Sequence, residues 1–244
     1  MTAVASIAPR DRRPLWAFFL GLAGLTGLGW AWSLQLATAG HHALPLGARV
    51  LMWTTMMVGM MVPPEVPTLL GLARGRATGR GRALAEAWSV LGGYLAVWIA
   101  ASALIALLDA QLGAWGVMTH EMASRSVPLD VAILGAAGLV QLSPWKRICL
   151  ERCRALRREL LARGSVHAVR AGLRHGLVSV LSCGVLMLTL LVVGAMNVLA
   201  MVLLTAFLVL ERVAPPSVAA MLGRVCGVGL VGWGGWLALR ASGV

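Results

Sequence analysis

Charged residues are scarce in this sequence, and several common catalytic motifs are missing from it. Only 12% of its 244 residues are Asp, Glu, Lys or Arg, whereas soluble domains carry about 25%. The chain has no Walker loop, no His-Glu-x-x-His helix, no serine–lysine dyad and no phosphate-binding glycine loop. These absences argue against a soluble domain and against a pump that hydrolyses ATP by itself. We therefore expect a membrane protein that is not an enzyme.

Acidic residues are fewer still, nine against 21 basic ones, which gives a formal net charge of +12. That charge would suit nucleic acid, but no basic stripe with interleaved aromatic residues is present. The basic residues instead gather in a few segments between apolar runs, as they do in the cytoplasmic loops of membrane proteins. All but Lys146 are arginine. We expect the lipid bilayer as a partner, and no nucleic acid.

Apolar residues make up 59% of the sequence and occur in unbroken runs. Runs of about 20 residues with few charges are typical of membrane-spanning helices. The sequence predicts an all-α fold, a polytopic transmembrane helix bundle of about seven spans (six are possible), forming one integral domain over residues 1–244. The expected spans are 15–39, an uncleaved first helix; 49–73, interrupted by Pro63, Pro64 and Pro67; 88–108; 129–143; two helices within 176–210, divided near Asn197; and 218–239.

The basic segments alternate along the chain and predict its orientation. The cytoplasmic tail, residues 1–14, the connection after the second helix and the segment 145–175 hold three, four and nine basic residues. By the positive-inside rule these lie in the cytoplasm, so the N-terminus is inside and the C-terminus outside. The basic segment 145–175 is expected to form an amphipathic helix at the cytoplasmic interface.

The second predicted helix is rich in methionine. Met52, Met56 and Met60 follow each other at intervals of four and share one helix face, with Met57 and Met61 beside them. Thioethers favour Cu(I), but methionine also fills irregular gaps between helices. The spacing alone leaves both interpretations open. Glu65 follows in the same helix and is expected near the cytoplasmic interface.

Four cysteines are too few, and wrongly placed, for a secreted disulfide framework, because two of them fall in the basic segment that should be cytoplasmic and reducing. Cys149 and Cys153 lie four residues apart, which on a helix brings both sulfurs to one face. Cys183 is expected near that pair, whereas Cys226 is expected to serve packing. The pair is a candidate for a soft metal ion, the alternative being a structural turn.

A second candidate metal contact lies on the opposite side of the membrane. The connection after the third helix contains Met118, His120 and Met122, two thioethers and an imidazole within five residues. Such a string is a possible copper contact, although histidine also occurs in loops where it has no function.

Several of these strings, taken in order, resemble a known family. They are Met52-Trp53 through Met60-Met61-Val62-Pro63; Gln141-Leu142-Ser143-Pro144-Trp145-Lys146-Arg147 with Cys149, Cys153 and Arg154; Gly172 to Gly176 with Cys183; and Met187, Val193-Gly194, Met196-Asn197 and Glu211. Over roughly residues 49 to 213 the chain resembles the bacterial family of predicted metal-binding integral membrane proteins, which includes membrane copper chaperones for polyphenol oxidases. The resemblance implies copper as the bound metal, a location in the bacterial inner membrane and a protein partner. It implies Cys149, Cys153, Cys183 and the methionines of the second helix as copper ligands.

The chain also departs from the family pattern. Ser182-Cys183-Gly184 stands where the family has Gly-Cys-Cys-Trp, Ser179 replaces a further cysteine, and Val140 replaces a tyrosine. Fewer thiols weaken the binding of a soft metal ion. The leading hypothesis is a copper-binding accessory or chaperone protein that handles Cu(I) for a cuproenzyme. The alternative is a non-catalytic structural subunit of a larger membrane complex.

Overall fold

The computed structural model describes residues 13–38, 45–74, 80–119, 122–163, 167–195 and 197–243. These residues are helical apart from short connections and one isolated β-bridge between Met118 and Ser124, which confirms the all-α class. The helices are α1 (Arg13–Thr38), α2 (Leu46–Ala73), α3 (Arg80–Ala114), α4 (Val127–Leu142), α5 (Pro144–Arg163), α6 (Ala168–Met187), α7 (Thr189–Val193), α8 (Val198–Val213) and α9 (Pro216–Ala241).

Five stretches are long and apolar enough to cross a membrane: Trp16–Gln35, Leu46–Ala73, Gly81–Ala114, Ala168–Val193 and Pro216–Ala241. The pair α4 and α5 adds a sixth only if it is taken as one span with a bend of 61°. Of the seven expected spans, the sixth corresponds to α8, whose 16 residues extend only about 24 Å, less than the ~30 Å of bilayer hydrocarbon. By length and composition, the described residues therefore support a membrane protein with five or six spans, and a crossing by α8 stays a prediction.

The expected division near Asn197 coincides with the break between α7 and α8. Gly194 has a φ of 100°, a left-handed conformation that glycine adopts without steric strain. Asn197 then caps α8, because its side-chain oxygen accepts a hydrogen bond from the backbone N–H of Ala200 at 3.1 Å. The glycine and the asparagine together turn the chain back on itself.

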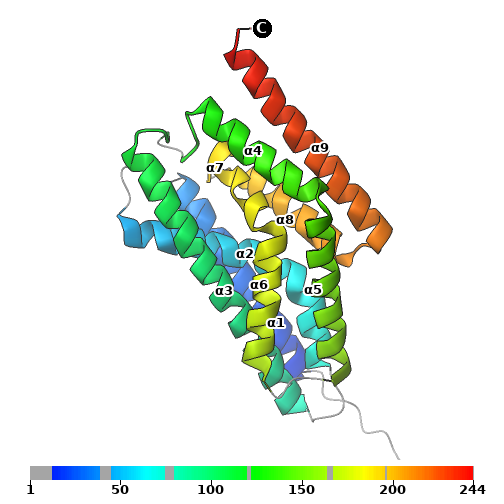
Figure 1. Ribbon diagram of the computed structural model, residues 1–244. Coiled ribbons are helices and arrows are strands. Elements are labelled where there is room, and N and C mark those ends of the chain that lie inside the picture. The colour runs from blue at the N-terminus through cyan, green and yellow to red at the C-terminus, as the bar shows by residue number, and fades with distance from the viewer. Residues whose placement is uncertain are drawn as a thin grey trace, which may run out of the picture.

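The helices run alternately up and down the bundle (Figure 1). At the lower end in this view α1, α3 and α6 begin, while α2 and α5 end. This end therefore carries Arg74, Arg82 and Arg170, and the C-terminus lies at the opposite end. The arrangement agrees with the alternation of basic segments in the sequence; the cytoplasmic location of this end stays a prediction.

Helix α2 continues through Pro63, Pro64 and Pro67, so the predicted interruption is wrong. A proline lacks the N–H that would bond the carbonyl four residues earlier, and Pro63 leaves the carbonyl of Gly59 without its helical partner. The indole Nε1–H of Trp30 in α1 donates to that carbonyl at 3.2 Å. Packing against α1 thus supplies a donor that the proline removes.

Helix α3 extends beyond the expected span 88–108 at both ends. Asp109, which that span places in the following connection, therefore lies within the helix. Asp109 lies within α3 and is 0% exposed, and Arg49 of α2 donates to its carboxylate at 2.8 Å. A buried carboxylate needs such a partner. The ion pair explains why the helix can continue past a charged residue.

Glycines allow two pairs of helices to approach closely. A methyl group on Gly172 of α6 would collide with the backbone of Val90 in α3, and one on Gly93 of α3 would collide with the backbone of Val169. Gly138 of α4 and Gly227 of α9 make a similar contact. Among the glycines of α9, Gly227 thus serves packing, whereas no atoms surround the Cβ positions of Gly229, Gly232 and Gly235.

We expected the basic segment 145–175 to form one helix. It instead comprises α5 and the first turns of α6. Helix α5 runs beside α6 (Figure 1) and buries Cys149, Leu150 and Leu160. It carries Lys146 and six arginines. Because these charges lie on a helix packed against its neighbours, α5 is part of the bundle; its position at the membrane interface stays a prediction.

Candidate metal centre

Three cysteines from two helices lie inside the bundle. Helix α5 carries Cys149 and Cys153 and α6 carries Cys183, with exposed fractions of 3%, 4% and 1%. Cys153 interacts electrostatically with both of the other thiols, and the Cys183 thiol donates to the carbonyl of Ser179 at 3.1 Å. All three thiols therefore lie in the interior, on two neighbouring helices; the expected position of the α5 pair at the cytoplasmic side stays a prediction. Their role as ligands stays a prediction.

Lys146, the single lysine of the chain, lies among these thiols. Its side chain is 3% exposed, and its ammonium group forms a salt bridge of 2.9 Å with Glu211 of α8. It also donates to the carbonyl of Ser182 in α6 at 3.0 Å. Lys146 therefore ties α5 to α6 and α8, and its charge acts on each of the cysteine thiols, Cys149, Cys153, Cys183 and Cys226.

A second group of charged side chains lies around Glu65. This carboxylate is buried between helices, at 4% exposed, and its expected depth near the cytoplasmic interface stays a prediction. It forms an ion pair with Arg212 of α8, and its second oxygen lies within hydrogen-bonding distance, 2.9 Å, of the Nε2 atom of His175 in α6. Arg212 also donates to the hydroxyl of Ser179, which lies 3.3 Å from that of Tyr94. The buried charges are thus compensated by partners from three other helices.

A small cavity connects the two groups. Its volume is about 20 Å³, and Cys153, His175 and Arg212 contribute to its wall together with Pro64, Leu150, Arg154 and Arg157. A space of this size holds about one water molecule. The Nδ1 atom of His175 is buried without a hydrogen-bond partner in the described part of the chain. The cysteines of α5 and α6 and the charged side chains around Glu65 therefore belong to one continuous polar region.

The methionine face of α2 is buried in the hydrophobic core. Met52, Met56, Met57, Met60 and Met61 are each no more than 1% exposed, and the core that contains them also contains Cys183. The face points into the bundle, as a role in copper binding requires. Burial is equally what packing would give, so both interpretations of this face stay open.

The described residues of the outer string lie in the connection between α3 and α4. Met118 is paired with Ser124 by the β-bridge, and Met122, which has a φ of 55°, is 4% exposed. Ser124 and Ala195 donate backbone N–H groups to Leu191 and Met122 respectively, so the connection is held against the end of α7. His120 lies outside the described residues, so its part in this candidate contact stays a prediction.

No three His, Cys, Asp or Glu side chains within the described ranges are placed to hold one metal ion. Cu(I) also binds the thioether sulfur of methionine, and methionine is not one of these four residue types. What sequence reasoning missed is the charged network, above all Arg212 and the burial of Glu65. The available signal was that ionisable residues inside apolar helices usually have a function and a partner.

Comparison with known proteins gives one result. A family model described as PpoB2, copper chaperone, matches residues 50–237. No curated protein and no solved structure matches the chain. The matched residues include both groups of the polar region.

Proposed function

Because this chain belongs to the PpoB2 copper-chaperone family, we propose that it is a membrane accessory protein that carries Cu(I) and passes it to a cuproenzyme. Copper is the cargo, the apolar helices lie in the bacterial inner membrane with the N-terminus in the cytoplasm, and the receiving enzyme is the protein partner. A chaperone performs no chemical conversion, so the proposed role is not that of an enzyme.

The observation that carries this proposal is the burial of three thiols on the neighbouring helices α5 and α6. Soft sulfur ligands select Cu(I) over the hard cations that are abundant in cells. Cys153 is electrostatically coupled to both Cys149 and Cys183, and it lines the small cavity. We assign Cys153 and Cys183 as the pair that holds the ion, with Cys149 as the ligand that exchanges.

Lys146 lies beside such a site but offsets only part of its charge, because it also neutralises Glu211. Two thiolates and one Cu(I) ion carry a net charge of −1, which is costly to bury without a counter-charge. The ammonium group of Lys146 acts electrostatically on all three thiols. In this proposal the ion would leave by ligand exchange with a partner's thiols.

The methionines of α2 provide a route to the thiols. Met56 and Met60 lie on one face of the helix, and Pro64, one turn further on, lines the cavity beside Cys153. Thioethers bind Cu(I) without needing to lose a proton, so they suit a transit path rather than a final site. Met118 and Met122, with His120, are the proposed entry from the other end of α3.

The alternative of a purely structural subunit is not favoured. It accounts for the glycine contacts between helices, but gives no reason for three buried cysteines on α5 and α6, one of which, Cys183, shares a core with the methionine face. The family description favours copper handling.

The thiol site is tested by replacing Cys153 and Cys183 together with serine in the detergent-purified protein. Serine keeps the size but is a poor ligand for Cu(I), so affinity should fall by more than the roughly tenfold to hundredfold caused by losing a hydrogen bond to a ligand. Competition with a chromogenic Cu(I) chelator under reducing conditions measures the affinity. Cys226→Ser in α9 is the matched control and should bind as the parent does. A double variant with parental affinity would refute the assignment.

The methionine path is tested by Met56→Leu combined with Met60→Leu. Leucine fills nearly the same volume, and each change costs under ~1.5 kcal/mol of stability, so the protein should fold. The rate of Cu(I) loading should fall while the affinity at the thiols stays, as measured by stopped-flow mixing with a Cu(I)–chelator complex. Met221→Leu, at an exposed position of α9, controls for loss of a thioether elsewhere. Unchanged loading of the double variant would mean that these methionines serve packing.

A further inference from the structure

A groove between α5 and α6 has no part in the proposed copper path. One hollow of about 360 Å³ is lined by Leu156, Glu159, Leu160, His167, Arg170, Ala171 and Arg174. A neighbouring hollow of about 450 Å³ shares Leu156, Glu159 and Arg174 and adds Arg152, Ala155, Leu177 and Val178. Because they share three residues, the two hollows form one groove along the helix pair. Volumes in this range are typical of small-ligand sites.

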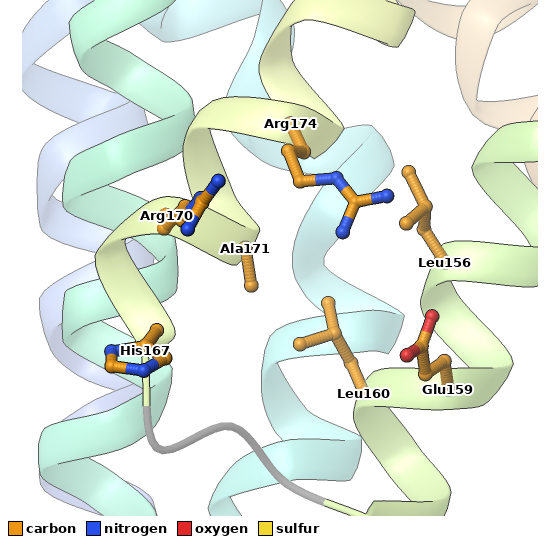
Figure 2. A pocket seen from close by; sticks show the side chains of 7 residues that line it. All are labelled: Leu156, Glu159, Leu160, His167, Arg170, Ala171 and Arg174. Carbon is orange, nitrogen blue, oxygen red and sulfur yellow. The ribbon is translucent and has the colours of Figure 1, made fainter.

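The charges in this groove favour an anion. Arg152, Arg170 and Arg174 against Glu159 give a net charge of +2 (three minus one). None of the three guanidinium groups forms a salt bridge with a described residue, unlike those of Arg49 and Arg212. Arg170 and Arg174 are one helical turn apart, so both can contact one ligand. Figure 2 shows Arg174 extending from α6 across the gap toward Leu156 of α5.

Apart from His167, the other residues that line the groove are aliphatic. An exposed apolar surface continues from the groove along α6. Leu156 and Leu160 of α5 form the wall opposite the arginines, and Ala171 lies between the arginines on α6 (Figure 2). Beyond Arg174, Leu177 and Leu181 are 54% and 51% exposed, within a stretch apolar enough to span a membrane. A soluble anion would gain nothing from this apolar continuation. A ligand with a phosphate at one end and a hydrocarbon chain at the other would contact all of it.

We propose that the α5–α6 groove binds one anionic phospholipid of the surrounding bilayer, with its phosphate held by Arg170 and Arg174 and an acyl chain lying along Leu177 and Leu181. Guanidinium groups bind phosphate oxygens through paired hydrogen bonds. Basic pockets between helices at the cytoplasmic side of a membrane bind such headgroups. The groove lies at the end of the bundle where α5 ends and α6 begins, the end at which the sequence predicts the cytoplasm.

The test uses the full-length protein in a neutral detergent with phosphatidylglycerol, phosphatidylcholine and glycerol 3-phosphate as separate probes. Native mass spectrometry counts the lipids retained. We expect one phosphatidylglycerol to bind more tightly than phosphatidylcholine, and glycerol 3-phosphate not to compete with it. Equal retention of the two lipids would overturn the proposal, and competition by glycerol 3-phosphate would point to a soluble anion instead.

The double change of Arg170 and Arg174 to glutamine should weaken phosphatidylglycerol binding by about thirtyfold, because each arginine near an anionic lipid contributes about 1 kcal/mol. Both side chains are exposed, so folding should survive, and an unchanged thermal midpoint without lipid checks this. Arg82→Gln with Arg224→Gln, exposed outside the groove, is the matched control. Replacement by lysine at 170 and 174 should recover part of the binding. Equal loss in the control, or none in the groove variant, would refute the site.

Discussion

Lys146 shows how much a single side chain can connect in this protein. It is almost fully buried, yet it contacts Glu211 of α8 and the carbonyl of Ser182 in α6. A buried ion pair is balanced only while both partners are present, because the loss of one leaves a desolvated charge. The pair therefore makes the positions of α5 and α8 depend on each other.

We predict that Lys146→Met destabilises the protein by about 3–5 kcal/mol, because it leaves Glu211 as an unpaired buried charge. Lys146→Met combined with Glu211→Met removes both charges and should recover most of this loss. Thermal unfolding in detergent measures the order of stabilities. The matched control is Arg152→Met, an exposed change on the same helix, which should have little effect. A double variant no more stable than the single one would contradict the explanation.

Among the elements, α3 and α6 depend most on close backbone contact. Gly172→Ala should separate these helices, because its methyl group would collide with the backbone of Val90. Backbone atoms cannot move aside as a flexible side chain can, so a loss of about 1–3 kcal/mol is expected. Gly92→Ala in α3 is the control, because open space surrounds its Cβ position and alanine favours helix.

The yield of folded protein and the unfolding temperature measure this difference. Because Cys183 lies on α6, Gly172→Ala should also weaken Cu(I) binding, whereas Gly92→Ala should not. Equal behaviour of the two alanine variants would mean that the α3–α6 contact adjusts more easily than the backbone geometry indicates.

The helices themselves were predictable from the sequence, because long apolar runs set their positions and Gly194 with Asn197 marks a turn. The ends of the helices were less predictable. Asp109 suggested a loop, since the sequence could not show that Arg49, 60 residues earlier, neutralises it. Likewise Pro63 suggested a break in α2, because the donor that replaces its missing N–H comes from Trp30 of another helix.

The candidate site was predictable in its sulfur atoms but not in its charges. The spacing of Cys149 and Cys153 indicates one helix face by local geometry alone. The pairing of Glu65 with His175 and Arg212 joins residues more than 100 positions apart, and no local pattern encodes such a contact. The burial of all these groups is a property of the assembled bundle.

At the scale of the whole molecule, the open question is which ends of the helices share a side of the membrane. We predict that a reporter fused at Gly79 lies in the cytoplasm, and that reporters at Met122 and at the C-terminus lie outside. Paired alkaline phosphatase and fluorescent protein fusions distinguish the two sides. The C-terminal reporter is decisive for α8, because a cytoplasmic result would mean that this short helix does not return the chain across the membrane before α9.

The burial of the single lysine also affects how the protein can be studied by chemical labelling. Reagents that acylate side-chain amines have only Lys146 as a lysine target, and its ammonium group is enclosed by three helices. Labelling of this residue must therefore wait for α5 to move away from α6 and α8. Its rate reports directly on the opening of the region that contains the three thiols, so mass spectrometry of Lys146 acylation can follow that opening.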